Sequence, residues 1–351
     1  MKNAPPNART HEGEAKLKLG RHIIVGGTGF LGRSVARRLL KNGNEVLIVA
    51  RAPAGDAVLM DGARVVHACS EEVKWDSILE PHDVIHYYAW NSVPGTANGD
   101  PAEDMRTNVA PLIRLLEAMR KIGPTCRIIF TSSGGTVYGN PKDIPVPESH
   151  PLSPITAYGA GKAAAELYLN FYRQLYGLDC RIARLANPYG PGQNIAKGQG
   201  AISIFLDRIF QKEPIKIWGD GETVRDYIFI DDAVNGLLAV AETECTPSNW
   251  TFNIGSGHGT SLNILIAHLQ ELVDWQLEVD YLPGRGFDVP ISVLDISRAR
   301  TELDWQPHVG LSVGLKRTFD VIAIQKIDSA IKNRLDDSST VRKKIKLPPV
   351  A

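Results

Sequence analysis

The hydrophobic residues near the start of the chain fall into short continuous runs that alternate with a longer segment of helical spacing. Residues 21–25 (RHIIV) form the first apolar run, and a glycine-rich segment at 26–32 follows it directly. Apolar residues then recur every four positions at Leu31, Val35 and Leu39, which predicts a helix over 30–41 that ends at Asn42-Gly43-Asn44. A second apolar run at 45–49 completes one βαβ unit.

The same alternation continues through the first half of the chain. It predicts strands at 84–88, 127–130 and 180–184, and helices at 101–122 and 156–176. Continuous apolar strands separated by helices are typical of a parallel sheet that is covered on both faces. The predicted fold class is therefore α/β, with a Rossmann-type doubly wound parallel sheet.

After Asn187 the pattern changes, because glycine and proline become frequent and the helical segments shorten. Segments 215–218 and 277–281 read as small strands of a smaller C-terminal substrate-binding lobe. We therefore divide the chain into a flexible extension (1–19), a dinucleotide-binding domain (20–186), a mainly substrate-binding lobe with some segments returning to the sheet (187–330) and a polar tail (331–351). The basic residues of that tail are Arg342, Lys343, Lys344 and Lys346.

Composition narrows the class of protein. The 351 residues carry 39 basic and 39 acidic side chains, so nothing predicts the basic face of a nucleic-acid-binding protein. No run approaches the ~18 apolar residues of a membrane span, and the polar start lacks a signal-peptide core, so we expect a cytoplasmic protein. The scattered cysteines predict reduced core thiols and no metal site; they are Cys69, Cys126, Cys180 and Cys245.

The glycine-rich segment has the spacing and context of a dinucleotide-binding turn. Gly26 permits the tight turn from strand to helix, Gly29 lets a pyrophosphate approach the backbone, and Gly32 lets the helix pack close to the sheet. Phe30 and Leu31 open the helix, whose N-terminal N–H groups attract phosphate. The predicted cofactor is NAD or NADP.

The second strand leaves the choice of cofactor open. An acidic residue at its end normally binds the adenosine ribose, but Ala50 stands there and Arg51 follows. Arginine can pair with the 2′-phosphate of NADP, which favours NADP slightly. A solvated loop arginine is the alternative interpretation.

Tyr158 and Lys162 are four residues apart in a predicted helix, so their side chains share one face. An ammonium group favours phenolate, and we expect it to lower the pKa of Tyr158 toward the working pH. Such a tyrosine can exchange a proton with a sugar hydroxyl while hydride moves to or from a nicotinamide. The lysine can also hold the nicotinamide ribose.

With these features the chain resembles the extended short-chain dehydrogenase/reductase family, and within it the nucleotide-sugar epimerases and dehydratases. The resemblance spans about residues 21–317 and rests on ordered motifs. The motifs are 26–32 (GGTGFLG), 131–139 (TSSGGTVYG), 158–162 (YGAGK), 185–192 (LANPYGPG), 224–228 (VRDYI), 283–288 (PGRGFD) and 302–307 (ELDWQP).

The resemblance implies a role for each matching residue. Tyr158 would be the catalytic acid/base with Lys162 as its electrostatic partner. Asn108 would help to organise the site, and Ala89 would contribute to the cofactor pocket. The substrate residues implied are Asn187, Arg225 and Arg285 at the diphosphate and Asp288 at the nucleotide ribose.

The chain departs from the family pattern at two places. The catalytic hydroxyl usually lies where this chain has Gly134, so it must come from Ser133 or Thr136, with a local distortion of the strand end or a change of residue. The third-strand aspartate that meets adenine is also absent, since the stretch reads His67-Ala68-Cys69-Ser70. No acidic pair stands beside the hydroxyl, which disfavours a dehydratase.

Three functions follow as hypotheses. The first is a nucleotide-sugar 4-epimerase, for which the resemblance implies a UDP-linked substrate and a place in polysaccharide biosynthesis. The second is an NADPH-dependent nucleotide-4-ketosugar reductase, and the third is a non-catalytic nucleotide-binding sensor or scaffold. Segments 89–99 and 193–200, including Trp90, Asn91 and Ser92, are where a hexose could be met. Relatives imply a homodimer formed through helices 101–122 and 156–176.

Overall fold

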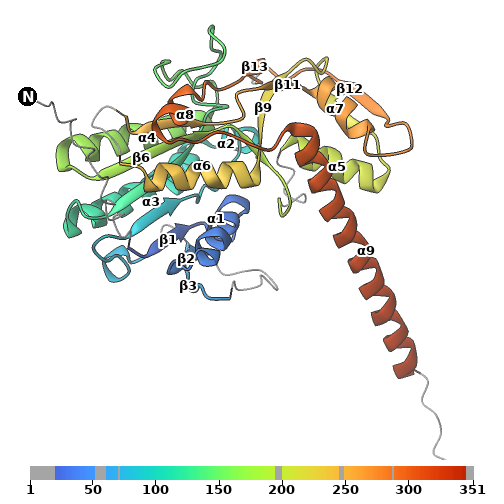
Figure 1. Cartoon of the computed structure of the whole chain (residues 1–351), viewed down its shortest axis with the longest axis horizontal. Coiled ribbons are helices and arrows are strands. Elements are labelled where there is room, and N and C mark those ends of the chain that lie inside the picture. Colours follow the sequence, from blue (N-terminus) through green and yellow to red (C-terminus); the bar gives the residue numbers. More distant parts are fainter. Residues whose placement is uncertain are drawn as a thin grey trace, which may run out of the picture.

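The computed structural model describes residues 20–344, apart from 52–60, 70–71, 194–199, 245–248 and 287. The extension expected at 1–19 and the end of the chain from 345 lie outside the described residues. Figure 1 shows a layered α/β body, a second group of short strands and helices beside it, and one long helix that leaves the body.

The centre of the body is a seven-stranded sheet in the order β10-β6-β5-β4-β1-β2-β3. Every neighbouring pair in it is parallel, which confirms the predicted parallel sheet. Strand β10 comes from the second half of the chain and forms one edge of this sheet. The strands are β1 (His22–Val25), β2 (Val46–Ala50), β3 (Arg64–His67), β4 (Val84–Tyr87), β5 (Arg127–Ser133), β6 (Asp179–Leu185) and β10 (Thr251–Ile254).

Helices cover both faces because successive strand residues point to opposite sides. Ile24 packs in the core under α1 (Phe30–Lys41) and α6 (Ile230–Glu242). Its neighbour Ile23 packs in the core under α3 (Pro101–Ile122) and α4 (Ala157–Tyr176). The helices predicted at 30–41 and 101–122 are confirmed, and Thr156 is the N-cap of α4 rather than its first residue.

Short strands pair into two smaller sheets in the second half of the chain. β9 pairs with β7, β11 and β13, and β8 pairs with β12 in parallel. The strands predicted near 215–218 and 277–281 are therefore confirmed, the second with a shift of two residues. The strands are β7 (Asn187–Tyr189), β8 (Ile215–Trp218), β9 (Val224–Phe229), β11 (Gly259–Ser261), β12 (Val279–Leu282) and β13 (Ile291–Ser292). The remaining helices in this half and near β4 are η1 (Trp75–Ser77), α2 (Pro94–Ala97), α5 (Ala201–Gln211), α7 (Leu262–Gln270) and α8 (Ser297–Glu302).

The C-terminal segment differs from the prediction. A polar tail was expected from 331, whereas α9 (Leu311–Lys344) continues as one helix through most of it. No glycine or proline interrupts the chain between Leu315 and Lys344, so nothing in the sequence stops the helix there. Figure 1 shows α9 running away from the layered body.

The cysteines also correct one expectation. Cys126 and Cys180 are buried free thiols, but Cys69 is exposed and so is not part of the core, while Cys245 lies outside the described residues. Among the residues that the structure describes, none of the helices combines the length and apolar character that crossing a bilayer requires. In the same residues, no group of metal-ligating side chains is placed to hold an ion.

A buried ion pair attaches α4 to the sheet. Glu166 on α4 and Arg184 on β6 lie 2.7 Å apart with 1% and 8% of their side chains exposed. The same carboxylate accepts a hydrogen bond from the Ser132 hydroxyl on β5. One side chain of the helix therefore holds two neighbouring strands.

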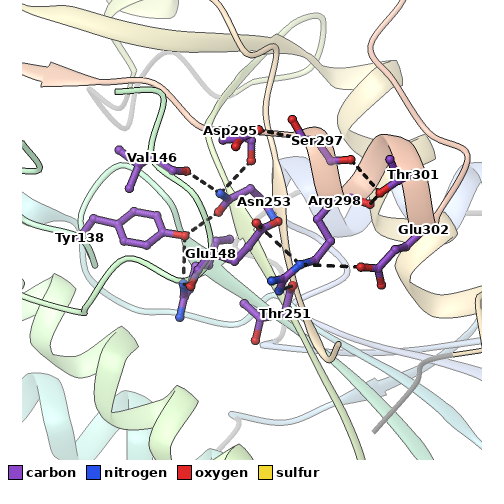
Figure 2. A network of polar contacts seen from close by, with 11 residues as sticks. Tyr138, Val146, Glu148, Thr251, Asn253, Asp295, Ser297, Arg298, Thr301 and Glu302 are labelled. Atoms are coloured by element: carbon purple, nitrogen blue, oxygen red, sulfur yellow. Dashed lines mark hydrogen bonds and ion pairs between the residues drawn. The ribbon is translucent and has the colours of Figure 1, made fainter. Parts of the chain in front are cut away.

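The polar network continues from this pair to the segment before α8. Arg184 donates to the Tyr138 hydroxyl at 2.9 Å, and that hydroxyl donates to Asn253 Oδ1 at 2.7 Å. Asn253 Nδ2 in turn donates to the carbonyl oxygens of Val146 and Asp295, as Figure 2 shows. The network ties β6, β10 and the chain after β13 into one unit.

Glu166→Ala tests how much stability this pair contributes. The substitution leaves the Arg184 guanidinium buried without its carboxylate, so we expect the free energy of unfolding to fall by about 3–5 kcal/mol, measured by urea denaturation. Asp320→Ala, which breaks the exposed pair of Lys316 and Asp320, is the control and should leave the midpoint almost unchanged. Equal effects of the two substitutions would refute the anchoring role of Glu166.

Candidate active site

A cleft of about 620 Å³ opens at the carboxyl ends of the parallel strands. Open α/β sheets bind their ligands at this edge. Its walls come from the glycine turn, from the ends of β5 and β6, from the start of α4 and from the loop after β12. The predicted site residues that line it are Gly26, Gly29, Phe30, Leu31, Gly32, Ser133, Thr136, Tyr158, Lys162, Asn187, Arg225, Arg285 and Asp288, whereas Arg51, Ala89 and Asn108 do not line it.

The glycine turn has the geometry that a pyrophosphate needs. Gly26 has φ +86°, and a Cβ there would lie 2.8 Å from the backbone nitrogen of Ala89. A Cβ on Gly32 would lie 2.4 Å from the Gly26 carbonyl oxygen. Gly29 is the N-cap of α1, and no side chain caps the helix there. The first N–H groups of α1 therefore face a cleft without a side chain in front of them, which fits a dinucleotide phosphate.

A second arginine, which was not predicted as a site residue, lines the cleft near the glycine turn. Arg51 is exposed after β2, whereas Arg33 lines the cleft and donates from Nη2 to the Thr28 carbonyl oxygen at 3.0 Å. The sequence signal that could have identified Arg33 is its place directly after Gly32, in the first turn of α1. A role for Arg51 at a 2′-phosphate stays a prediction.

Tyr158 and Lys162 both reach the cleft from the first turns of α4. The Lys162 ammonium is buried, with 5% of the residue exposed, and donates to the Thr131 carbonyl oxygen at 2.8 Å. The ring centroid of Trp90 lies 3.9 Å from Nζ and that of Tyr158 lies 5.8 Å away. Aromatic faces therefore supply part of the stabilisation that water would give this cation.

Burial shifts both groups of the pair away from their ordinary values. It lowers the pKa of Lys162 to about 7, against the opposing effects of Glu166 and Asp104. It also raises the pKa of Tyr158 to about 12, with a further rise from Asp104 and a partial offset from a hydrogen bond with Ser133. The expected fall in the Tyr158 pKa is therefore wrong for the protein alone, because burial disfavours the charged phenolate.

The end of β5 explains where the nearby hydroxyl comes from. A Cβ on Gly134 would lie 2.5 Å from a Leu294 methyl carbon, so a side chain there would point into the core. The N–H groups of Thr136 and Val137 both donate to the Ser133 carbonyl oxygen, at 3.2 and 3.1 Å. This turn brings Ser133 and Thr136 to the cleft together. Ser133 hydrogen-bonds Tyr158, whereas the buried Thr136 hydroxyl has no partner among the described residues.

Asn108 lies behind the cleft wall rather than in it. Its Oδ1 accepts from the Asn91 N–H at 2.7 Å, and its Nδ2 donates to Asp104 Oδ1 at 2.9 Å. The Ser92 hydroxyl also donates to Asp104 Oδ1. Two side chains of α3 thus hold the loop that carries Trp90 and Ser92, both of which line the cleft. The carboxylate of Asp104 was not recognised from the sequence.

The far end of the cleft is the basic end. Asn187 Nδ2 donates to the Asp226 carbonyl oxygen at 3.0 Å, which fixes its amide beside β9. Arg225 donates to the Val289 carbonyl oxygen at 2.6 Å, and burial lowers its pKa. Arg285 pairs with Asp288 at 2.9 Å and stacks over Trp218. Two guanidinium groups in one wall suit a diphosphate.

Comparison with known proteins adds the context of relatives. Residues 22–255 match the model of the NAD dependent epimerase/dehydratase family. A UDP-glucose 4-epimerase of Mycolicibacterium smegmatis is 35% identical over 86% of this chain and 97% of its own. A dTDP-4-dehydro-6-deoxyglucose reductase of Escherichia coli is 32% identical over 86% and 96%. The solved structure of UDP-glucose 4-epimerase from Thermotoga maritima with UDP-glucose superposes with a TM-score of 0.82, at 34% identity over 87% and 99% of the two chains.

The buried ammonium predicts a pH-dependent stability. Lysine has a pKa of about 10.4 when unfolded, and Lys162 has one of about 7 when folded, so the unfolded chain binds the extra proton between these values. The folded protein should therefore gain stability relative to Lys162→Met as the pH rises from 7 to 10. The gain should amount to a few kcal/mol, measured by urea denaturation.

The control for this measurement is Lys316→Met, which removes an exposed lysine. That variant should follow the wild type at every pH, because water solvates the Lys316 ammonium in both states. If the free energy of unfolding changes with pH in the same way for the wild type and for Lys162→Met, the lowered pKa of Lys162 is contradicted.

Proposed function

The chain belongs to the NAD dependent epimerase/dehydratase family, and we propose that within this family of sugar-nucleotide enzymes it is a UDP-hexose 4-epimerase. The observation that carries the proposal is the arrangement of one continuous cleft. The glycine turn, Tyr158 with Ser133, and the arginines 225 and 285 all line it. A dinucleotide and a nucleotide sugar can both enter the cleft and meet at the tyrosine.

The chain's own residues would bind both molecules by charge and by backbone donors. Phe30 and Leu31 would offer N–H groups to the cofactor pyrophosphate, while the Gly29 N–H donates to the Gly26 carbonyl oxygen at 3.0 Å and closes the turn. Arg225 and Arg285 would pair with the substrate diphosphate, because guanidinium forks match phosphate oxygens. Asp288, which now pairs with Arg285, would accept from the ribose hydroxyls of the substrate.

The proton chemistry would lie with Tyr158. When bound, the nicotinamide would take up the hydride from sugar C4 and return it to the other face of the 4-keto sugar. Tyr158 would accept the proton of the C4 hydroxyl as phenolate and give it back afterwards. The Lys162 ammonium favours that phenolate electrostatically. Its hydrogen bond to the Thr131 carbonyl oxygen keeps it directed toward the cleft.

The structure favours Ser133 as the hydroxyl that acts with Tyr158. It already hydrogen-bonds the phenol, and it lies in the cleft wall. Thr136 also lines the cleft, but its hydroxyl oxygen is buried and has no partner among the described residues, so we assign it a place in the wall and no contact with the sugar. The two candidates from the sequence would then have different roles.

A 4-ketosugar reductase is the second candidate function. The observation in its favour is Arg51 after Ala50, where NADP could be bound through its 2′-phosphate, and a reductase is among the relatives. The same Tyr158 and Lys162 would serve it. A non-catalytic sensor has less support, because Tyr158 and Lys162 reach the same cleft as the glycine turn.

Cofactor analysis separates these functions. An epimerase returns its hydride in every cycle, so we expect the purified protein to release NAD on denaturation in nearly stoichiometric amount, identified by mass. The same preparation should convert UDP-galactose to UDP-glucose without added cofactor, followed by chromatography. Protein that emerges empty, binds NADPH better than NADH and oxidises it with a 4-keto sugar nucleotide would instead establish the reductase.

Tyr158→Phe is the control for this experiment. It should keep the bound nucleotide and lose conversion by a factor of about 10²–10⁴, because only the proton transfer is removed. Unchanged conversion would exclude Tyr158 as the acid/base, and absence of both nucleotide and turnover in the wild type would support the sensor.

We also propose that the protein is a homodimer formed through α4. Leu167, Phe171 and Leu175 follow each other at intervals of four and are 65%, 45% and 60% exposed, and Tyr168 beside them is 40% exposed. Tyr172, by contrast, is buried in the core. An apolar stripe of this kind on an otherwise well-packed helix suits a second copy of the chain.

Sedimentation measures this directly. The wild type should sediment as a dimer, and Leu167→Asp should shift it toward the monomer because a charge would have to be buried. Ile264→Asp on α7, at a position that is 53% exposed, should leave the dimer intact. A monomeric wild type would refute the proposal.

A further inference from the structure

Asp104 is a buried carboxylate that the proposed function has not used. It lies in the first turn of α3 and is 4% exposed. Its Oδ2 faces α4, where a Cβ on Gly161 would lie 2.9 Å from that oxygen and 3.2 Å from the Trp90 ring. Gly161 lies between Tyr158 and Lys162 in the sequence, so the Asp104 carboxylate lies against α4 beside the catalytic pair.

The two oxygens of Asp104 have different surroundings. Oδ1 accepts hydrogen bonds from Asn108 Nδ2 and from the Ser92 hydroxyl. Oδ2 is buried and accepts no hydrogen bond from the described residues. Buried charged oxygens without partners are rare because they lose the hydration of a carboxylate without replacement. Since no hydrogen bond from the described residues compensates the negative charge at Oδ2, that charge can act on the groups of α4.

Few charged groups surround the pair. Glu166, one turn beyond Lys162 on α4, already shares its charge with Arg184 of β6. The loop after β4 contributes Trp90, and β5 contributes the Thr131 carbonyl oxygen and the Ser133 hydroxyl, none of which is charged. Among the described residues packed here, Asp104 is the acidic group that no arginine or lysine contacts at ion-pair distance.

We propose that Asp104 is a positioning residue that acts through Lys162 and Tyr158, its unshared charge keeping the buried ammonium protonated and holding the proton on the phenol. The proposal rests on the proposed roles of those two residues. A nearby negative charge stabilises an ammonium and destabilises a phenolate. The directions of the shifts in the pKa values of Lys162 and Tyr158 agree with this, since Asp104 raises both.

The burial of Lys162 opposes its proposed role, because that role requires a protonated ammonium group. Burial makes the Lys162 ammonium lose its proton more easily, and a neutral amine would no longer favour phenolate. Asp104 protects the ammonium, while the hydrogen bond from Ser133 offsets part of the tighter proton on Tyr158. Glycine at 161 is required, because any side chain there would displace the carboxylate.

Asp104→Asn removes the charge and keeps the contacts. The amide oxygen can take the place of Oδ1 and accept from Ser92 and Asn108, and the amide nitrogen can replace Oδ2, which accepts nothing. The experiment is lysine 13Cε NMR of the full chain as a function of pH. The signal of Lys162 is assigned by its absence in Lys162→Met. We expect Asp104→Asn to lower the Lys162 pKa by about one unit.

Two controls separate charge from structure. Ser92→Ala removes a hydrogen bond of Asp104 but leaves its charge, and Glu103→Gln removes an exposed charge from the same turn of α3. Neither should lower the Lys162 pKa. If Asp104→Asn fails to fold, Asp104→Ser makes the same comparison. A Lys162 titration that is identical in wild type and the neutral variant overturns the proposal.

Turnover gives an independent readout. If UDP-galactose is converted, both limbs of the pH–rate profile should move to lower pH in Asp104→Asn, because Tyr158 and Lys162 each lose their proton more easily. If no conversion is found in any form, the epimerase proposal fails while the NMR comparison still decides the role of Asp104.

Discussion

The carboxylate of Glu166 determines where the catalytic helix sits. It is 1% exposed, pairs with Arg184 on β6 and accepts from Ser132 on β5, so it holds α4 against two strands at once. Isolated burial of such a charge would be very costly, and only the guanidinium and the hydroxyl together make it tolerable. Because Tyr158 and Lys162 lie about two turns and one turn before Glu166, this contact sets their depth in the cleft. The hydrogen bonds of Tyr138 and Asn253 then connect this region to the chain beyond β13 (Figure 2).

A second constraint is the close approach of backbones at the glycine turn. Gly32 packs against the Gly26 carbonyl oxygen, and Gly26 packs against Ala89 at the end of β4. Ala89 thus supports the glycine turn from beneath without lining the cleft. A search for polar side chains in a cleft does not find such a residue, because it supports the backbone and does not reach the cleft.

Local patterns in the sequence were enough to predict the parallel sheet, the glycine turn and the shared face of Tyr158 and Lys162. Each depends on residues that are close in the sequence. The misplaced expectations depended on contacts between distant segments. The Tyr158 pKa rises instead of falling because the site buries the phenol and because the charge of Asp104, from another helix, disfavours the phenolate. The sequence did not predict the role of Gly134 either, because Leu294, which would clash with a Cβ at that position, lies far along the chain.

The catalytic pair by itself does not determine which reaction follows. Relatives of this chain named as an epimerase and as a reductase match it over nearly the same share of its length. In both reactions a tyrosine proton and a nicotinamide hydride meet at one sugar carbon. The outcome depends on whether the keto sugar stays and turns over before the hydride returns. That requires a middle cleft wide enough for rotation and firm contacts at the diphosphate. Here the cleft is lined by Trp90, Ser92 and Thr136, by the small Gly95 and Gly135, and by both arginines. A sugar held mainly through its diphosphate can rotate between the two transfers of hydride, whereas a sugar held firmly through its hydroxyls cannot.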